Sequence, residues 1–152
     1  MNITIREARI TDIPAVAEMF DLYRQLYEQK PDLPLAKQFI ADRLSNHESV
    51  ILVAESVSSG MLGFCQLYPS FCSVEAKPIY SLYDLFVLPV ARKSGVGRML
   101  LNAAESKAAA EDKSRMDLTT ARTNQPAQSL YESLSWVRDE IFFSYNRRVP
   151  QS

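Results

Sequence analysis

Glycine, cysteine and histidine are all scarce in this chain, with four, two and one residues among 152. The glycine share is less than half of the usual value of about 7%. Cys65 and Cys72 form neither a metal-binding pattern nor a disulfide framework. We therefore expect two reduced thiols, no metal site and a cytoplasmic location. The single histidine, His47, lies in a polar stretch and is expected to be a solvated loop residue.

Two further absences exclude classes of partner. The chain has seventeen Lys and Arg and eighteen Asp and Glu, so it lacks the basic excess that is typical of nucleic-acid binding. No apolar run approaches the roughly 18 residues of a membrane span. Residues 1–9 carry charges among their apolar side chains, unlike a secretory signal. We therefore predict neither a nucleic-acid partner nor a membrane.

What is present is the composition of one folded domain. Hydrophobic residues make up 47% of the chain and charged residues 23%, close to globular averages. A chain of this length can bury roughly two-thirds of its unfolded surface. We therefore predict a single domain over residues 1–152.

Hydrophobic periodicity predicts the elements of this domain. Strands are expected over residues 3–6, 50–57, 61–68, 79–88 and 115–121, with one or two more around residues 136 and 141–145. Helices are expected over residues 13–27, 35–44, 95–111 and 126–134. This order of elements predicts an α/β (α+β) fold with a mixed sheet.

Two of the four glycines, Gly95 and Gly97, lie where a predicted strand ends and a helix begins. Glycine lets the backbone approach a ligand closely, and the first N–H groups of a helix have no partner inside it. The helix dipole favours an anion there, and three basic residues surround the same turn, Arg92, Lys93 and Arg98. The pattern predicts a phosphate-binding turn, or else a tight connection that uses glycine for packing alone. It matches neither a P-loop nor the dinucleotide fingerprint.

The residues around this turn resemble the Gcn5-related N-acetyltransferase (GNAT) family. That family has Arg/Gln-x-x-Gly-x-Gly/Ala after an apolar strand ending in Val-x-Pro, as in Val87-Leu88-Pro89 followed by Arg92-x-x-Gly95-x-Gly97. A second family motif is similar to Asn124 followed by Leu130-Tyr131 and by Leu134-Ser135-Trp136, with Ser135 in place of the usual glycine. The start of the chain, Ile5-Arg6-Glu7-Ala8, is also similar to family openings.

This resemblance implies a particular sheet and a cosubstrate. The implied sheet has about six or seven mostly antiparallel strands with about four helices, and it opens in a V between the fourth and fifth strands. Acetyl-CoA would bind there, with its pantetheine arm along Leu85, Phe86 and Val87. Its pyrophosphate would meet the turn made by Arg92, Lys93, Ser94, Gly95, Val96, Gly97 and Arg98. Asn124 would reach the pantetheine, although read alone it is a residue that starts a helix.

The resemblance also implies roles in catalysis. Tyr131 would be the general acid for the departing thiolate, while its place in an apolar helical stripe alone suggests a core residue. Family members often carry a glutamate that acts as the general base, at positions matching Ser81 or Tyr83. Neither of these residues is acidic here. Asp84 and Tyr83 remain candidates, directly or through water. Period two predicts Asp84 on the face opposite Tyr83, where a buried structural role is the alternative.

We therefore predict an acetyl-CoA-dependent N-acetyltransferase that acts on a primary amine of a small molecule or a peptide. The amine would attack the thioester directly in a ternary complex, without a metal. Weaker acceptor-site candidates are Tyr23, Tyr27 and Glu28, at the end of the first helix. Two alternatives stay open, a non-catalytic CoA-binding module of the same fold and a transferase of another acyl group. A homodimer is the habit of the family.

Overall fold

Five strands form one sheet in the order β1-β2-β3-β4-β5, in a computed structural model that describes residues 2–152. The strands are β1 (Ile3–Glu7), β2 (Val50–Ser56), β3 (Gly60–Cys72), β4 (Lys77–Val87) and β5 (Met116–Asp117). Pairing is antiparallel from β1 to β4 and parallel between β4 and β5. The predicted mixed, mostly antiparallel sheet is therefore confirmed. The chain is described as two units, Met1–Thr119 and Thr120–Ser152, and the prediction of one domain stays a prediction.

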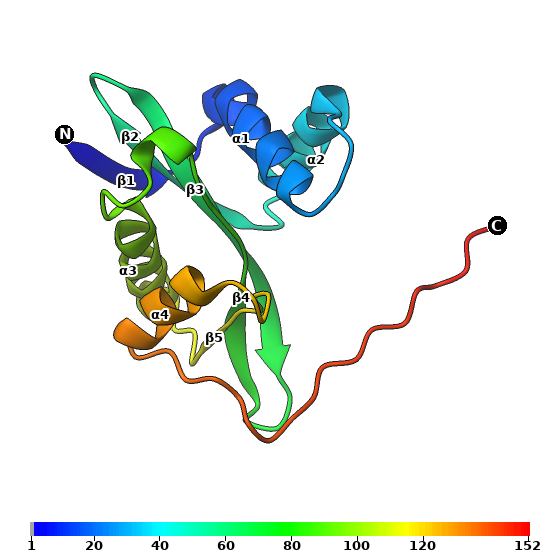
Figure 1. The fold of residues 1–152 in the computed structure, drawn as a ribbon. Helices are drawn as coiled ribbons and strands as arrows, with labels where there is room; N and C mark the ends of the chain where they lie inside the picture. The colour runs from blue at the N-terminus through cyan, green and yellow to red at the C-terminus, as the bar shows by residue number, and fades with distance from the viewer. Residues whose placement is uncertain (1) are drawn as a thin grey trace. The chain divides into compact units, whose positions relative to one another are not determined.

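Three helices of the first unit cover the two faces of this sheet (Figure 1). Helices α1 (Ile13–Leu26) and α2 (Leu33–Ser45) lie on one face, and α3 (Val96–Ala110) lies on the other. Successive strand residues point to opposite faces, so Ile51 and Val53 enter the core beneath α1 and α2 while Leu52 points away from it. No helix within residues 2–152 has the length and apolar character needed to cross a bilayer.

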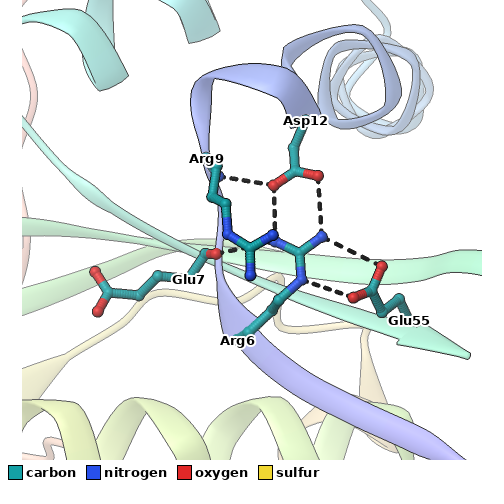
Figure 2. A network of polar contacts seen from close by, with 5 residues as sticks. All are labelled: Arg6, Glu7, Arg9, Asp12 and Glu55. Atoms are coloured by element: carbon teal, nitrogen blue, oxygen red, sulfur yellow. Dashed lines mark hydrogen bonds and ion pairs between the residues drawn. The ribbon is translucent and has the colours of Figure 1, made fainter.

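An ion-pair network holds the start of α1 against the sheet (Figure 2). The Arg6 guanidinium on β1 donates to both Asp12 oxygens at 2.8 and 3.0 Å and to Glu55 of β2 at 2.6 and 3.2 Å. The Asp12 carboxylate also accepts the Arg9 N–H at 2.7 Å. Hydrogen bonds from Arg6 lower the pKa of both carboxyl groups. Because each contact is charge-assisted and doubly bonded, the network fixes where the chain leaves β1 for the short 3-10 turn at Ile10–Asp12.

The prediction of six or seven strands is wrong, since the described residues contain five. Residues 136 and 141–145 form no strand. The Asp139 carboxylate accepts the N–H groups of Ile141 and Phe142 at 2.8 and 3.1 Å, which is a local turn. Phe143 is 83% exposed. A strand is stabilised by cross-strand partners rather than by its own side chains. The apolar character of these residues therefore predicted more strands than the sheet contains.

The second unit contains α4 (Gln125–Ser133), which ends in a Schellman motif. The Trp136 N–H donates to the Tyr131 carbonyl at 3.0 Å, and the Ser135 N–H donates to Glu132 at 3.1 Å. The Tyr131 and Trp136 rings pack 6.0 Å apart, which is the hydrophobic contact expected of this motif. Ser135 has a φ of 70°, a left-handed conformation that favours glycine.

We expect Ser135→Gly to raise the free energy of unfolding by up to about 1 kcal/mol, because glycine removes the strain of the left-handed conformation. Urea or thermal unfolding measures the change. The matched control is Ser129→Gly, at an exposed position inside α4, where glycine should cost about 0.5–1 kcal/mol. Equal destabilisation by both substitutions would contradict the assignment of strain to Ser135.

Candidate active site

β4 has an unpaired edge beyond its short contact with β5. The two strands pair only at Tyr80–Met116 and Ser81–Asp117, while β4 continues to Val87. The Leu88 N–H donates to Leu62 of β3 at 2.8 Å, so alternation turns the backbone groups of Leu85 and Val87 away from β3. Within the part of the chain that the structure describes, no strand pairs with that edge. This separation agrees with the expected opening between the fourth and fifth strands.

The chain passes from this edge directly into the predicted anion-binding turn. After a 3-10 turn at Pro89–Ala91, Gly95 adopts a φ of 87° and caps the N-terminus of α3. The first α-helical bond runs from the Met99 N–H to the Gly95 carbonyl at 3.0 Å. The N–H groups of Val96 and Gly97 therefore precede the helical ladder, and the positive end of the helix dipole adds to them.

Side chains of the turn hold it to the end of β4. Arg92 donates through Nε to the Val87 carbonyl at 3.0 Å, and its guanidinium lies 5.9 Å from the centre of the Phe86 ring. The Ser94 hydroxyl donates to the Ala91 carbonyl. Lys93 has a φ of 66°, and its side chain is exposed, as are those of Arg92 and Arg98. The turn therefore combines ordered backbone donors with three basic side chains.

A β-bulge in β4 creates a polar cluster under α1. Gln66 of β3 pairs with Asp84, whereas the next residue, Leu67, pairs with Leu82, so Tyr83 is the extra residue. The Tyr83 ring packs against Tyr68 and the Asp84 carboxyl bonds to Gln66. Gln66 and Tyr68 are two residues apart on β3, so they share one face of the sheet, which is the face beneath α1. The prediction that Asp84 lies opposite Tyr83 is therefore wrong, because the bulge interrupts the period of two.

Asp84 is held by neutral partners in this cluster. It is 4% exposed, and its Oδ2 accepts a hydrogen bond from Gln66 Nε2 at 2.7 Å. Gln66 is itself fully buried and accepts from the Ser49 hydroxyl at 2.7 Å. The Tyr23 hydroxyl of α1 donates to the Tyr83 carbonyl oxygen at 3.3 Å, and it also acts on the neighbouring Asp84 carboxyl. Sequence reasoning missed Gln66 and Ser49, although a glutamine within an apolar strand was an available signal.

Burial controls the protonation of this cluster. Desolvation raises the pKa of Asp84, against the hydrogen bonds from Gln66 and Tyr23, which lower it. Burial and then the neighbouring Asp84 charge raise the pKa of Tyr68 to about 12, and the same two causes raise that of Tyr23. Both phenols therefore stay protonated at neutral pH, and the carboxyl of Asp84 is a stronger base than an exposed aspartate.

The weaker acceptor candidates border this cluster on α1. The ring of Tyr27 packs 5.1 Å from that of Tyr23 and is 59% exposed. Glu28 is exposed and has a φ of 64° where the helix ends. On β4, the Tyr83 ring is 68% exposed and packs edge-on to Tyr68 at 5.5 Å. The first unit thus brings Tyr23, Tyr83 and Asp84 together.

Asn124 and Tyr131 belong to the second unit. The Asn124 side chain accepts the Ala127 N–H at 3.2 Å and caps α4, which confirms the structural alternative for this residue. Tyr131 is partly exposed, and its carbonyl accepts the N–H groups of Leu134 and Trp136. The expectation of a core residue for Tyr131 stays a prediction. The roles of both residues toward acetyl-CoA stay predictions.

The remaining candidates lie outside this region. His47 is exposed, as expected, and borders a cavity of about 230 Å³ that Glu7, Leu44 and Ser49 also line. Cys65 is buried and Cys72 partly so, and both are free thiols. Within residues 2–152, no three His, Cys, Asp or Glu side chains gather as a metal site would require.

Comparisons with known proteins agree with the motifs. The family model described as "Acetyltransferase (GNAT) family" matches residues 16–136. The chain is 45% identical over 146 residues to the "Uncharacterized N-acetyltransferase YhfO" of Bacillus subtilis (strain 168), covering 96% of this chain and 97% of the relative.

Solved structures show the same fold. A crystal structure of a probable acetyltransferase has a TM-score of 0.89 and 33% identity, with all of both chains covered. The ribosomal-protein-alanine N-acetyltransferase from Brucella melitensis biovar Abortus 2308 has a TM-score of 0.82 at 20% identity, covering 97% of this chain and 100% of that one, and this likeness concerns the fold alone. The chain therefore belongs to the GNAT family of acetyltransferases.

Proposed function

We propose that this protein transfers the acetyl group of acetyl-CoA to a primary amine. The observation that carries the proposal is the continuity of three features within the first unit. The unpaired edge of β4 at Leu85 and Val87 leads into the anion-binding turn, and the buried carboxyl of Asp84 precedes that edge on the same strand. A thioester arm, a pyrophosphate and an amine each find a chemically suitable group there.

The backbone of β4 and the turn suit acetyl-CoA. An extended pantetheine arm can bond to a free strand edge as an added strand does, and the N–H groups of Leu85 and Val87 are suitable donors. The N–H groups of Val96 and Gly97 suit the pyrophosphate. Binding would compete with Arg92 for the Val87 carbonyl, which frees that guanidinium for a phosphate.

Asp84 and Tyr23 suit the proton that the amine must lose. The amine nitrogen attacks the thioester carbon, the C–S bond breaks, one proton leaves the nitrogen and one reaches the thiolate. The phenol of Tyr23 has one hydrogen, which it donates to the Tyr83 carbonyl in the structure and can turn toward the ionised Asp84. Once Asp84 is protonated, it can donate to Tyr23, whose hydrogen then turns to the Tyr83 carbonyl 3.3 Å away. Asp84 thus accepts a proton without losing its partners, and Tyr131 is the proposed acid toward sulfur.

Thiol release from acetyl-CoA with a panel of alkylamines, aminoglycosides, amino acids and Lys peptides tests the function. We expect release that depends on at least one amine and yields the acetylated amine by mass. Tight CoA binding without release would favour a non-catalytic module. Faster release from propionyl-CoA or succinyl-CoA would assign another acyl group.

Gly97→Val tests the anion-binding turn. A branched side chain at the second position of α3 should keep the pyrophosphate from the backbone, and we expect acetyl-CoA to bind at least tenfold more weakly, about 1.4 kcal/mol. The matched control is Ala109→Val, which places the same β-branched residue at an exposed position of the same helix, away from the turn. Unchanged affinity by calorimetry in a folded Gly97→Val protein would remove the turn from the binding site.

A further inference from the structure

The carboxyl of Asp84 is buried without a cationic partner. Its hydrogen-bond partners are the amide of Gln66 and the phenol of Tyr23, both neutral. Within the described residues, no Lys, Arg or His forms an ion pair with it. By contrast, the half-buried Asp12 is neutralised by Arg6 at 2.8 Å. A buried carboxylate is normally paired or metal-bound, so the charge of Asp84 lacks the counter-ion that such a position usually has.

Asp21 shows what a purely structural acid looks like in this fold. It is 9% exposed, and its two oxygens accept the Asp32 N–H at 2.9 Å and the Gln25 amide at 3.2 Å. Those contacts join the end of α1 to the start of α2. Within the described residues, the Asp84 carboxyl accepts no backbone N–H that would join it to a loop or a helix end, and it instead lies among tyrosines.

The tyrosines around Asp84 offer ring faces to a cation. Tyr68 and Tyr83 pack edge-on at 5.5 Å, and Tyr83 is 68% exposed. The rings of Tyr23 and Tyr27 continue this surface on α1. An aromatic face attracts an ammonium group within about 6 Å of its centre. Arg43, whose charge acts on Tyr68, is already paired with Glu48 at 3.0 Å and stacked on Phe39 at 4.3 Å.

We infer that the acceptor is an organic cation: an amine on an apolar or further cationic body, with no carboxylate beside it, drawn past Tyr83 and Tyr68 toward Asp84. This inference rests on the proposed function and names the class of its acceptor. The bound ammonium supplies the missing counter-ion, and the ring faces replace its water. A carboxylate on the acceptor meets the fixed negative charge of Asp84, so the same group that attracts amines rejects amino acids.

A matched pair of acceptors tests this selection. Pentylamine and 5-aminopentanoate differ only in whether a methyl or a carboxylate ends the chain. We expect kcat/KM with acetyl-CoA to be at least tenfold higher for pentylamine. Equal values would overturn the inference, and so would a preference for 5-aminopentanoate. A preference for 5-aminopentanoate would indicate a cation that binds its carboxylate. Arg24 of α1 is the candidate, because its Nη1 is buried without a hydrogen-bond partner among the described residues.

A binding measurement separates recognition from catalysis. Free CoA carries no acetyl group, so pentylamine can be titrated into the CoA complex by calorimetry without turnover. We expect Asp84→Asn to weaken this binding at least tenfold and Tyr83→Leu at least threefold, while the control Asp21→Asn leaves it unchanged. Wild-type affinity in both of the first two variants, or no pentylamine binding to the wild-type complex, would overturn the inference.

The proposed function and the cation selectivity can be refuted separately. Absence of CoA binding and of thiol release with every amine would refute the proposed function. Normal turnover of both matched acceptors at equal rates would leave that function standing and refute the cation selectivity alone.

Discussion

Asp84→Asn is expected to lower kcat by about 100-fold or more, in line with the loss of a general base. Asparagine keeps the size of the side chain and an oxygen that accepts from Gln66, but its amide takes up no proton. The kcat and KM for the best amine of the panel measure the effect. A kcat within threefold of wild type would remove Asp84 from the proton path.

The pH profile gives a second readout for Asp84 that a merely structural role would not move. Below the pKa of Asp84 its carboxyl is protonated and accepts no proton from the amine, so kcat/KM falls on the acid side. Burial raises this pKa. The acid limb should therefore lie at a higher pH than the ordinary aspartate pKa of about 3.9. Asp84→Asn should abolish this limb, whereas Asp21→Asn should leave it in place.

Asp84→Asn should lower activity without lowering the stability of the fold at neutral pH. A carboxyl whose pKa is raised by folding favours the folded state below its unfolded pKa and loses that contribution as pH rises. At neutral pH the ionised Asp84 is therefore a cost to the fold, which asparagine removes. We expect an unchanged or higher melting temperature for Asp84→Asn at pH 7, with a smaller difference at pH 4. A large drop in melting temperature at pH 7 would favour a structural role.

Some features of the fold were predictable from the sequence and others were not, and what separates them is how far apart the interacting residues lie along the chain. The turn from Val87 to Gly97 was predictable because its chemistry is local: a strand end, a glycine with positive φ and a helix start follow one another in eleven residues. The helix α1 was predictable for the same reason, because its apolar residues recur at helical spacing, and Val16, Ala17 and Phe20 are buried.

The cluster around Asp84 depends on a partner strand. Whether Tyr83 and Asp84 share a face is decided by the bulge opposite Gln66, and nothing in β4 alone marks the extra residue. Gln66 and Ser49, 17 residues apart, meet only once β2 and β3 have paired. Likewise, residues 141–145 have the apolar character of a strand, but pairing decides whether they become one, and Asp139 turns their first N–H groups inward instead.

The hydroxyl of Tyr131 is the proposed acid for the CoA thiolate, and its position on α4 makes phenylalanine a clean test. The contacts of Tyr131 that end the helix use its backbone carbonyl and the face of its ring against Trp136. Tyr131→Phe keeps both and removes only the hydroxyl. If that hydroxyl protonates the thiolate, kcat should fall by about 100-fold or more, while acetyl-CoA affinity changes little because its proposed contacts lie on β4 and the turn before α3.

The structural alternative gives a different pair of results for the same protein. A lost hydrogen bond of Tyr131 would lower the free energy of unfolding by about 1 kcal/mol and leave turnover nearly intact. Steady-state rates and a melting curve on Tyr131→Phe therefore separate the two readings. Acyl donors whose thiols differ in acidity sharpen the test. A more acidic thiol leaves as the thiolate without needing a proton, so such a donor should restore the rate of the variant. Wild-type kcat in the folded variant would mean that the thiolate departs unassisted or takes its proton from water.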